Sequence, residues 1–374
     1  MTDKTDHKEN ASSAGTVYKA DGPSGARPKK KKGKLKKRLK WVLLALIALV
    51  AVVGAAILIP ITFGGAERDA VIKVPRDATF EVVHDSIEKY LGKSYADHAV
   101  MSMKMFGFEE SNRHGAYLIS KGMSPLRAGR RLSRGGQYGV TLTINGLRTK
   151  EDLASLIASR LDISKKDMLD AINDPALLNR HGTDPDKVMA YFLNNSYQLY
   201  WNSTPEEVIE KMHKEYNKFW NNNRLLHAEK LRLSPRAICI IASITDEETN
   251  DKTEKGRIGR LYINRLDEDM RLQADPTVRY ALKDFTIKRI SREDTRTPSP
   301  YNTYLVKGLP PGPIRTPDPE TIDAILYSSS SDDLFMCADT SFNGRHYFSA
   351  TYDKHQKYAD AYQQALNRRN IHRQ

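Results

Sequence analysis

The sequence is poor in cysteine and lacks the common motifs of nucleotide-binding and serine-hydrolase proteins. Its 374 residues include two cysteines, Cys239 and Cys337, too few for a disulfide framework. One bridge between them and two unpaired buried thiols are the two alternatives. No Walker, dinucleotide-binding or G-x-S-x-G motif is present. His346 is the one histidine that invites a metal interpretation, but no Cys, His or acidic cluster around it has ligand spacing. We therefore expect neither a cofactor nor a metal.

Charge is absent from one long stretch near the N-terminus. The 23 residues from Trp41 to Phe63 are uncharged and, as a helix, long enough to cross a hydrocarbon core of about 30 Å. The lysine-rich segment 29–40 precedes them, and no comparable basic flank follows. The positive-inside rule then places the N-terminus in the cytoplasm and the C-terminal residues outside it. A cleaved signal peptide is the alternative, but it has a shorter apolar run and a shorter polar segment before it.

The net charge of +13 is concentrated before this apolar run. Residues 1–40 hold 13 basic and four acidic residues and so contribute +9. The basic character therefore indicates membrane orientation and anionic lipid, and we expect no nucleic acid as a partner. The same residues have few large apolar side chains, which predicts a disordered basic tail.

The remaining chain predicts an α+β protein with more than one domain. Strand patterns at 71–75 and 115–119 enclose helical patterns, which predicts a small strand–helix–helix–strand module over residues 64–137. This module is either a binding domain or a spacer. Residues 138–233 read as a linking region with a strand at 140–146, followed by helices at 149–161, 164–172 and 204–226.

Three aromatic residues stand close together in the linking region. Tyr197, Tyr200 and Trp201 have rings that can stack on sugars, although such aromatics more often belong to a core or a domain interface. Both interpretations remain open from the sequence.

The strongest indication of chemistry lies at the start of residues 234–374, the predicted catalytic domain. Ser234 and Pro235 are typical of a helix start, and the apolar residues that follow form one stripe at helical spacing. Glu248 continues this stripe, whereas Asp246 projects from the opposite side. Burial raises a carboxyl pKa, which suits a general acid near neutral pH. The alternative is that Glu248 is a solvated or ion-paired residue at the helix end.

Several sequence blocks in this region resemble those of the YceG-like endolytic murein transglycosylases. They keep the family's order over about residues 242–355. The blocks are ASITDEET at 242–249, YINRL at 262–266, MRLQADPTV at 270–278, YNTY at 301–304, GLPPGPI at 308–314 and GRHYF at 344–348, with His355 at a later histidine of the family.

The resemblance implies a fold, an active residue and a reaction. Glu248 falls on the family's catalytic glutamate, and the upstream segments resemble its membrane helix and, more loosely, its LysM-like module. Asp246 departs from the usual glutamate, so we expect it to be supporting at best. The implied reaction is non-hydrolytic cleavage of the β-1,4 bond between MurNAc and GlcNAc in peptidoglycan, leaving a 1,6-anhydro end.

Further candidates lie in the same blocks. We expect substrate contacts from neutral polar, tyrosine and charged side chains, and supporting roles for Asn264 and Arg265 besides Asp246. Asp275 is also the candidate second carboxylate of a hydrolase, or else a residue of a turn or helix N-cap. Loop-backbone and structural roles remain the alternative for the others. The substrate-binding candidates are Gln273, Asp275, Tyr301, Asn302, Tyr304 and His346.

The sequence as a whole predicts a protein anchored in the bacterial inner membrane by one helix, with its catalytic domain in the periplasm. Its expected partners are peptidoglycan glycan strands, the membrane and, by the resemblance, peptidoglycan synthases. A catalytically silent glycan-binding scaffold and a lysozyme-like hydrolase are the competing interpretations.

Overall fold

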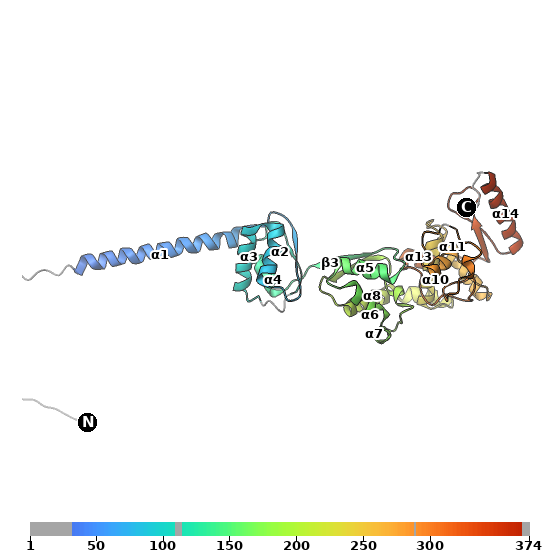
Figure 1. Cartoon of the computed structure of the whole chain (residues 1–374), viewed down its shortest axis with the longest axis horizontal. Helices are drawn as coiled ribbons and strands as arrows, with labels where there is room; N and C mark the ends of the chain where they lie inside the picture. Colours follow the sequence, from blue (N-terminus) through green and yellow to red (C-terminus); the bar gives the residue numbers. More distant parts are fainter. Residues whose placement is uncertain (1–31, 109–113, 288, 369–374) are drawn as a thin grey trace, which may run out of the picture. The chain divides into compact units, whose positions relative to one another are not determined.

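The computed structural model describes residues 32–108, 114–287 and 289–368 (Figure 1). The described residues fall into two units, one that ends at residue 59 and one that begins at residue 60. Most of the predicted disordered tail lies outside the described residues. The prediction of disorder is wrong for residues 32–40, because they form the first turns of helix α1, Lys32–Phe63.

Helix α1 contains the uncharged stretch predicted from the sequence. Within the described part of the chain, one helix is long and apolar enough to cross a membrane, over Lys36–Phe63. Most of its large apolar side chains between Leu39 and Ile59 are exposed, as expected for a helix that crosses a membrane, whereas Ile61 near its end is buried. Pro60 lies in its last turn, where it removes one hydrogen bond of the helix close to its end.

The small module has the predicted order of strands and helices. Strands β1, Ala70–Val74, and β2, Gly115–Ile119, pair antiparallel, with Ile72 opposite Tyr117. The side chains of Thr79 and Ser124 cap α2 and α4. The module has its own apolar core. Its helices are α2 Phe80–Leu91, α3 Lys93–Met105 and α4 Pro125–Arg134.

The next region builds helices around a second antiparallel pair. Tyr197 and Trp201 are buried in it, which favours the core interpretation, while Tyr200 is exposed. The predicted single helix at 204–226 is wrong: it divides into two, because the chain leaves the helix at Trp220 and Asn221 caps a new one. The elements are β3 Gly139–Ile144, α5 Lys150–Arg160, α6 Lys165–Asn173, α7 Pro175–Arg180, η1 Val188–Tyr191, β4 Asn195–Tyr200, α8 Pro205–Phe219 and α9 Asn222–Lys230.

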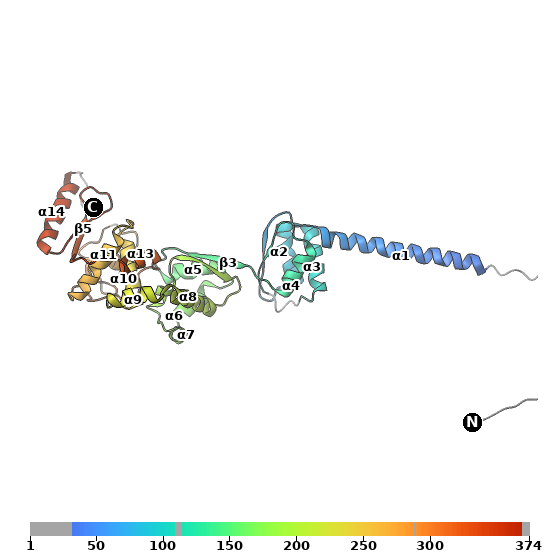
Figure 2. The same ribbon diagram turned by 180° about the vertical axis from the view of Figure 1, so that it is seen from behind.

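The C-terminal region is mostly helical, with one hairpin. Figures 1 and 2 show α10 among α9, α11 and α13, which agrees with its contacts. The two cysteines are unpaired, which decides between the two alternatives, but Cys337 is only half-buried. The elements are α10 Pro235–Glu248, α11 Lys255–Asp267, α12 Asp275–Leu282, η2 Asp294–Arg296, α13 Pro319–Leu326, β5 Phe335–Ala338, β6 His346–Ser349 and α14 Tyr352–Arg368.

One hydrophobic core continues from the linking region into the C-terminal region. It includes Leu142 of β3, Val208 of α8, Ile241 of α10 and Ile325 of α13. The division drawn between residues 233 and 234 therefore does not separate two cores, and α10 lies inside a single packed body.

Candidate active site

Helix α10 carries three consecutive carboxylates to the edge of this core. Ser234 caps its first turn by accepting from the Ala237 N–H, and Glu248 ends it. All residues from Ile238 to Asp246 are buried. The prediction that Asp246 faces away from the buried side is wrong, because packed elements cover α10 on that side as well.

Asp246 joins three helices. Its Oδ1 accepts hydrogen bonds from Lys255 Nζ of α11, at 2.7 Å, and from Thr321 Oγ1 of α13. Its Oδ2 accepts from the Asp318 N–H, the cap residue of α13, at 3.1 Å. With its oxygens so occupied and its side chain nearly inaccessible, Asp246 is a packing and positioning group.

Glu247 is held by two arginines from distant parts of the chain. Arg148 donates to both carboxylate oxygens, at 3.0 and 2.9 Å, and Arg315 donates to Oε1 at 3.1 Å. The turn before Arg315 is itself fastened to α10, because the Ile314 N–H donates to Ser243 Oγ at 3.1 Å. The bidentate pairing with Arg148 and the contact with Arg315 tie two loops to the end of α10.

Glu248 has a different environment from both neighbours. Its Oε1 accepts a hydrogen bond from Tyr262 Oη of α11, at 2.8 Å. Burial is the main cause that raises its pKa to about 7, and the nearby Asp275 charge adds to the effect. The Tyr262 hydrogen bond and Arg279 act in the opposite direction. Near neutral pH, Glu248 can therefore both donate and accept a proton.

Asp275 and Tyr304 form the next pair around Glu248. Tyr304 Oη donates to Asp275 Oδ1 at 2.7 Å. The N-cap of α12 is Ala274, so the predicted N-cap role for Asp275 is not observed and its carboxylate is held by Tyr304. Buried Thr303 fixes this arrangement, since its Oγ1 accepts from the Ala274 N–H at 3.0 Å.

Arg265 and Gln273 form a further polar pair among the site candidates. Arg265 Nη2 donates to Gln273 Oε1 at 2.7 Å, and Gln273 is exposed. Its backbone φ of 50° lies in the left-handed region, an uncommon choice for a residue other than glycine. Asn264 instead donates to the carbonyls of Ser331 and Asp333, so it supports a loop.

Three other candidates lie in different surroundings. Asn302 is fully buried, and its amide donates to the carbonyls of Thr295 and Thr297. This environment corrects the prediction that Asn302 contacts substrate. Tyr301 packs on Tyr280, with ring centroids 4.7 Å apart, and lines a separate hollow of about 300 Å³.

The third of these candidates, His346, stands on β6. Its Nδ1 lies 3.0 Å from Glu254 Oε2, and its backbone N–H donates to the other oxygen of the same carboxylate at 3.0 Å. This contact links the hairpin to the start of α11.

Sequence reasoning did not assign a role to Tyr262 or Arg279. Tyr262 stands in one of the family-like blocks, but a tyrosine 14 residues from Glu248 gives no sign of contact until α10 and α11 are packed. Arg279 follows Asp275 by one helical turn, a spacing that puts both on one side of α12 and would have been a usable signal.

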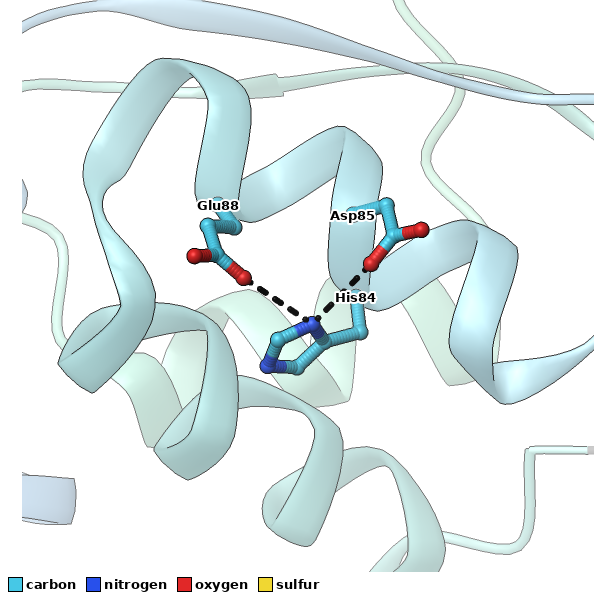
Figure 3. A group of neighbouring side chains, drawn as sticks. All are labelled: His84, Asp85 and Glu88. Carbon is cyan, nitrogen blue, oxygen red and sulfur yellow. Dashed lines mark hydrogen bonds and ion pairs between the residues drawn. The ribbon is translucent and has the colours of Figure 1, made fainter.

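A separate group of ligand-type side chains lies in the small module (Figure 3). His84 Nδ1 is 3.5 Å from both Asp85 Oδ1 and Glu88 Oε2, all on α2. The other ring nitrogen is 2.8 Å from Asp97 Oδ1 of α3, and this hydrogen bond is the main cause that raises the pKa of His84. The raised pKa favours a protonated imidazole, which can pair with all three carboxylates and so links helices α2 and α3.

Comparisons with known proteins agree with the sequence blocks. The chain is 28% identical over 272 residues to an endolytic murein transglycosylase of Bacillus subtilis, covering 68% of this chain and 74% of that protein. It is 26% identical over 178 residues to one of Streptococcus pneumoniae, covering 46% of this chain and only 31% of the relative.

A solved structure shares the fold. The crystal structure of a yceG-like protein from Listeria monocytogenes matches with a TM-score of 0.51 at 24% identity, covering 78% of this chain and 99% of that one. The model of the YceG-like family matches residues 72–361, well over half of the sequence, and the chain therefore belongs to the YceG-like family.

Proposed function

We propose that this protein is a lytic transglycosylase that cuts within peptidoglycan glycan strands, at the β-1,4 bond between MurNAc and GlcNAc. The observation that carries the proposal is Glu248, a partly buried carboxyl with a pKa of about 7 beside a neutral tyrosine donor. The names of the curated relatives support the same reaction.

One carboxyl group can carry both proton transfers. Protonated Glu248 gives its proton to the glycosidic oxygen while the bond from that oxygen to C1 of MurNAc breaks. The resulting carboxylate takes the proton of the MurNAc 6-hydroxyl, whose oxygen forms the new bond to C1. The products are a free 4-hydroxyl on GlcNAc and a 1,6-anhydro ring on MurNAc, and no water is consumed. Glu248 is protonated again at the end, so the cycle closes.

The neighbouring side chains fit supporting roles in this reaction. Tyr262 orients the Glu248 carboxyl and is kept protonated by burial, which raises its own pKa. Asp275, held by Tyr304, adds negative charge that favours the protonated acid and that would stabilise positive charge developing at C1. Exposed Gln273, fixed by Arg265, offers an amide to sugar substituents. For Tyr301 and His346 we still propose contacts with the glycan substrate.

The anchor and the small module complete the proposal. Helix α1 holds the protein in the bacterial inner membrane, with residues 1–40 cytoplasmic and the C-terminal domains in the periplasm. The β1–α2–α3–β2 order supports a LysM-like module that grips glycan. An enzyme that cuts at a fixed distance from the membrane would limit strand length, and peptidoglycan synthases are its expected partners.

A hydrolase using Glu248 with Asp275 is the second candidate, because the Asp275 charge acts on Glu248.

Incubating the full chain with purified glycan strands tests the catalytic assignment. Glu248→Gln should abolish fragment release, while Glu268→Gln, at an exposed glutamate on the end of α11, should leave it unchanged. Release by the Glu248→Gln variant at the normal rate would overturn the role of Glu248.

A further inference from the structure

The small module has a hollow of about 560 Å³ with a strongly basic wall. Five basic side chains line it, and no acidic side chain does among the described residues. None of the five belongs to an ion pair within the part of the chain that the structure describes. The five residues are Lys121, Arg127, Arg130, Arg131 and Arg134.

The sequence of α4 gathers these charges on one face. Its four arginines recur at steps of three, one and three residues, while Ala128 and Leu132 are buried on the other face. Arg131 is partly fixed, because its Nη1 donates to the Leu118 carbonyl at 2.6 Å. Arg127, Arg130 and Arg134 are exposed. The Arg134 guanidinium lies over the Phe106 ring, 5.3 Å from its centroid, a contact that leaves its N–H donors available for an anion.

The hollow lies close along the chain to the end of the apolar helix. Ala66, three residues after Phe63, donates its N–H to the Met123 carbonyl at 3.0 Å and accepts from the Gly122 N–H at 2.8 Å. Gly122 and Met123 line the hollow. Three residues span about 11 Å at most, so the hollow is near the point where the helix ends.

Two acidic residues between α1 and β1 could neutralise part of this basic wall. Glu67 and Asp69 are exposed, and Asp69 Oδ1 accepts from the backbone N–H of Lys121 at 2.6 Å. Asp69 therefore fixes the loop that carries Lys121, but its carboxylate bonds to backbone and leaves the five cationic side chains unneutralised.

We propose that this hollow binds the phosphate of anionic lipid headgroups at the surface of the membrane that α1 crosses. Guanidinium groups match phosphate oxygens bidentately, and clustered cations next to a membrane are attracted to anionic lipid. The inference rests on the membrane anchor proposed above and is independent of the cleavage reaction. Its consequence is that lipid holds the small module against the bilayer.

Hydrogen exchange of the full chain in lipid nanodiscs tests the inference. Amides of residues 121–135 should exchange roughly threefold or more slowly in discs with phosphatidylglycerol than in discs of phosphatidylcholine alone. High salt should remove the difference because it screens the phosphate contacts. The combined change Arg127→Gln, Arg130→Gln and Arg134→Gln should also remove it.

Matched controls make the result interpretable. The triple change Arg160→Gln, Lys165→Gln and Lys230→Gln removes the same charge from exposed positions outside the small module. This variant should still exchange more slowly in discs with phosphatidylglycerol. Unchanged exchange of β1 would show that the arginine variant is folded. Equal exchange in both discs would overturn the proposal, as would loss of the effect in the control variant. Protection by inorganic phosphate added to phosphatidylcholine discs would reassign the hollow to a soluble anion.

Discussion

Tyr262 Oη lies 2.8 Å from Glu248 Oε1, and this hydrogen bond joins the middle of α11 to the last residue of α10. The tyrosine is almost completely buried, so it donates to the carboxyl without bringing a charge to it. The two carboxylates that precede Glu248 on α10 have cationic partners instead. Asp246 pairs with Lys255, and Glu247 pairs with Arg148 and Arg315. Glu248 has no ion pair among the described residues, and burial is the main cause that raises its pKa to about 7.

The Tyr262→Phe change tests that hydrogen bond. Losing the donor removes an effect that lowers the pKa of Glu248, so the fall in kcat/KM with rising pH should move to higher pH. Loss of one orienting hydrogen bond, about 1 kcal/mol, should also reduce kcat/KM by roughly fivefold. The measurement is the pH–rate profile, with Tyr327→Phe, an exposed tyrosine outside the site, as control. An unmoved profile would argue against the coupling.

Asp275→Asn should act in the opposite direction. The Asp275 charge raises the pKa of Glu248, so its removal should move the fall in kcat/KM to lower pH. We expect a reduced but measurable rate at mildly acidic pH. A complete loss of cleavage at all pH values, in a folded variant, would instead favour Asp275 as the second carboxylate of a hydrolase.

Glu248→Gln should make the protein more stable at alkaline pH. A carboxyl whose folded pKa is about 7 binds more protons when folded than when unfolded, so its contribution falls as pH rises from about 4.5 to 7. Above that range the penalty is on the order of 3 kcal/mol, which the neutral glutamine avoids. Denaturant unfolding at pH 5 and pH 8 measures it. A stability gain equal at both pH values would contradict the raised pKa.

Asp246→Ala should destabilise the fold by about 3–5 kcal/mol, because it leaves the largely buried Lys255 without its partner. The double change with Lys255→Met should recover part of the loss. A double-mutant cycle of unfolding free energies measures the coupling, and additive effects of the two changes would show that the pair does not interact.

His84→Gln should weaken the small module mainly at acidic pH. The pKa of His84 is raised, above all by its hydrogen bond to Asp97, so its contribution is present below about pH 6.5 and is lost as pH rises through the folded value. The partly exposed pair is worth about 1 kcal/mol or less. Hydrogen exchange of α2 and α3 should show faster opening at pH 5.5 than in His98→Gln, and similar opening at pH 8.

Helical periodicity placed Glu248 on the apolar stripe but left a solvated or ion-paired role open, and the cap residues Ser124 and Ser234 located two helix starts. The same periodicity misplaced Asp246, because α10 is packed on nearly all sides and a stripe pattern assumes one solvent face. The break at Trp220 was also missed, since the polar residues beyond it continue a helical pattern.

The contacts of the site depend on packing between distant segments. Tyr304 reaches Asp275 from 29 residues away, and Arg315 reaches Glu247 from 68 residues away. The family-like blocks indicated that these segments belong together, but not which atoms meet. Asn302 illustrates the limit: its amide resembled a sugar-binding group and instead bonds to loop carbonyls.

Digestion of glycan strands in ¹⁸O-labelled water tests the central claim most directly. The full chain should give fragments with 1,6-anhydro-MurNAc ends and no ¹⁸O, because the 6-hydroxyl and not water attacks C1. Fragments with reducing ends that carry one ¹⁸O atom would contradict the account and make the protein a hydrolase.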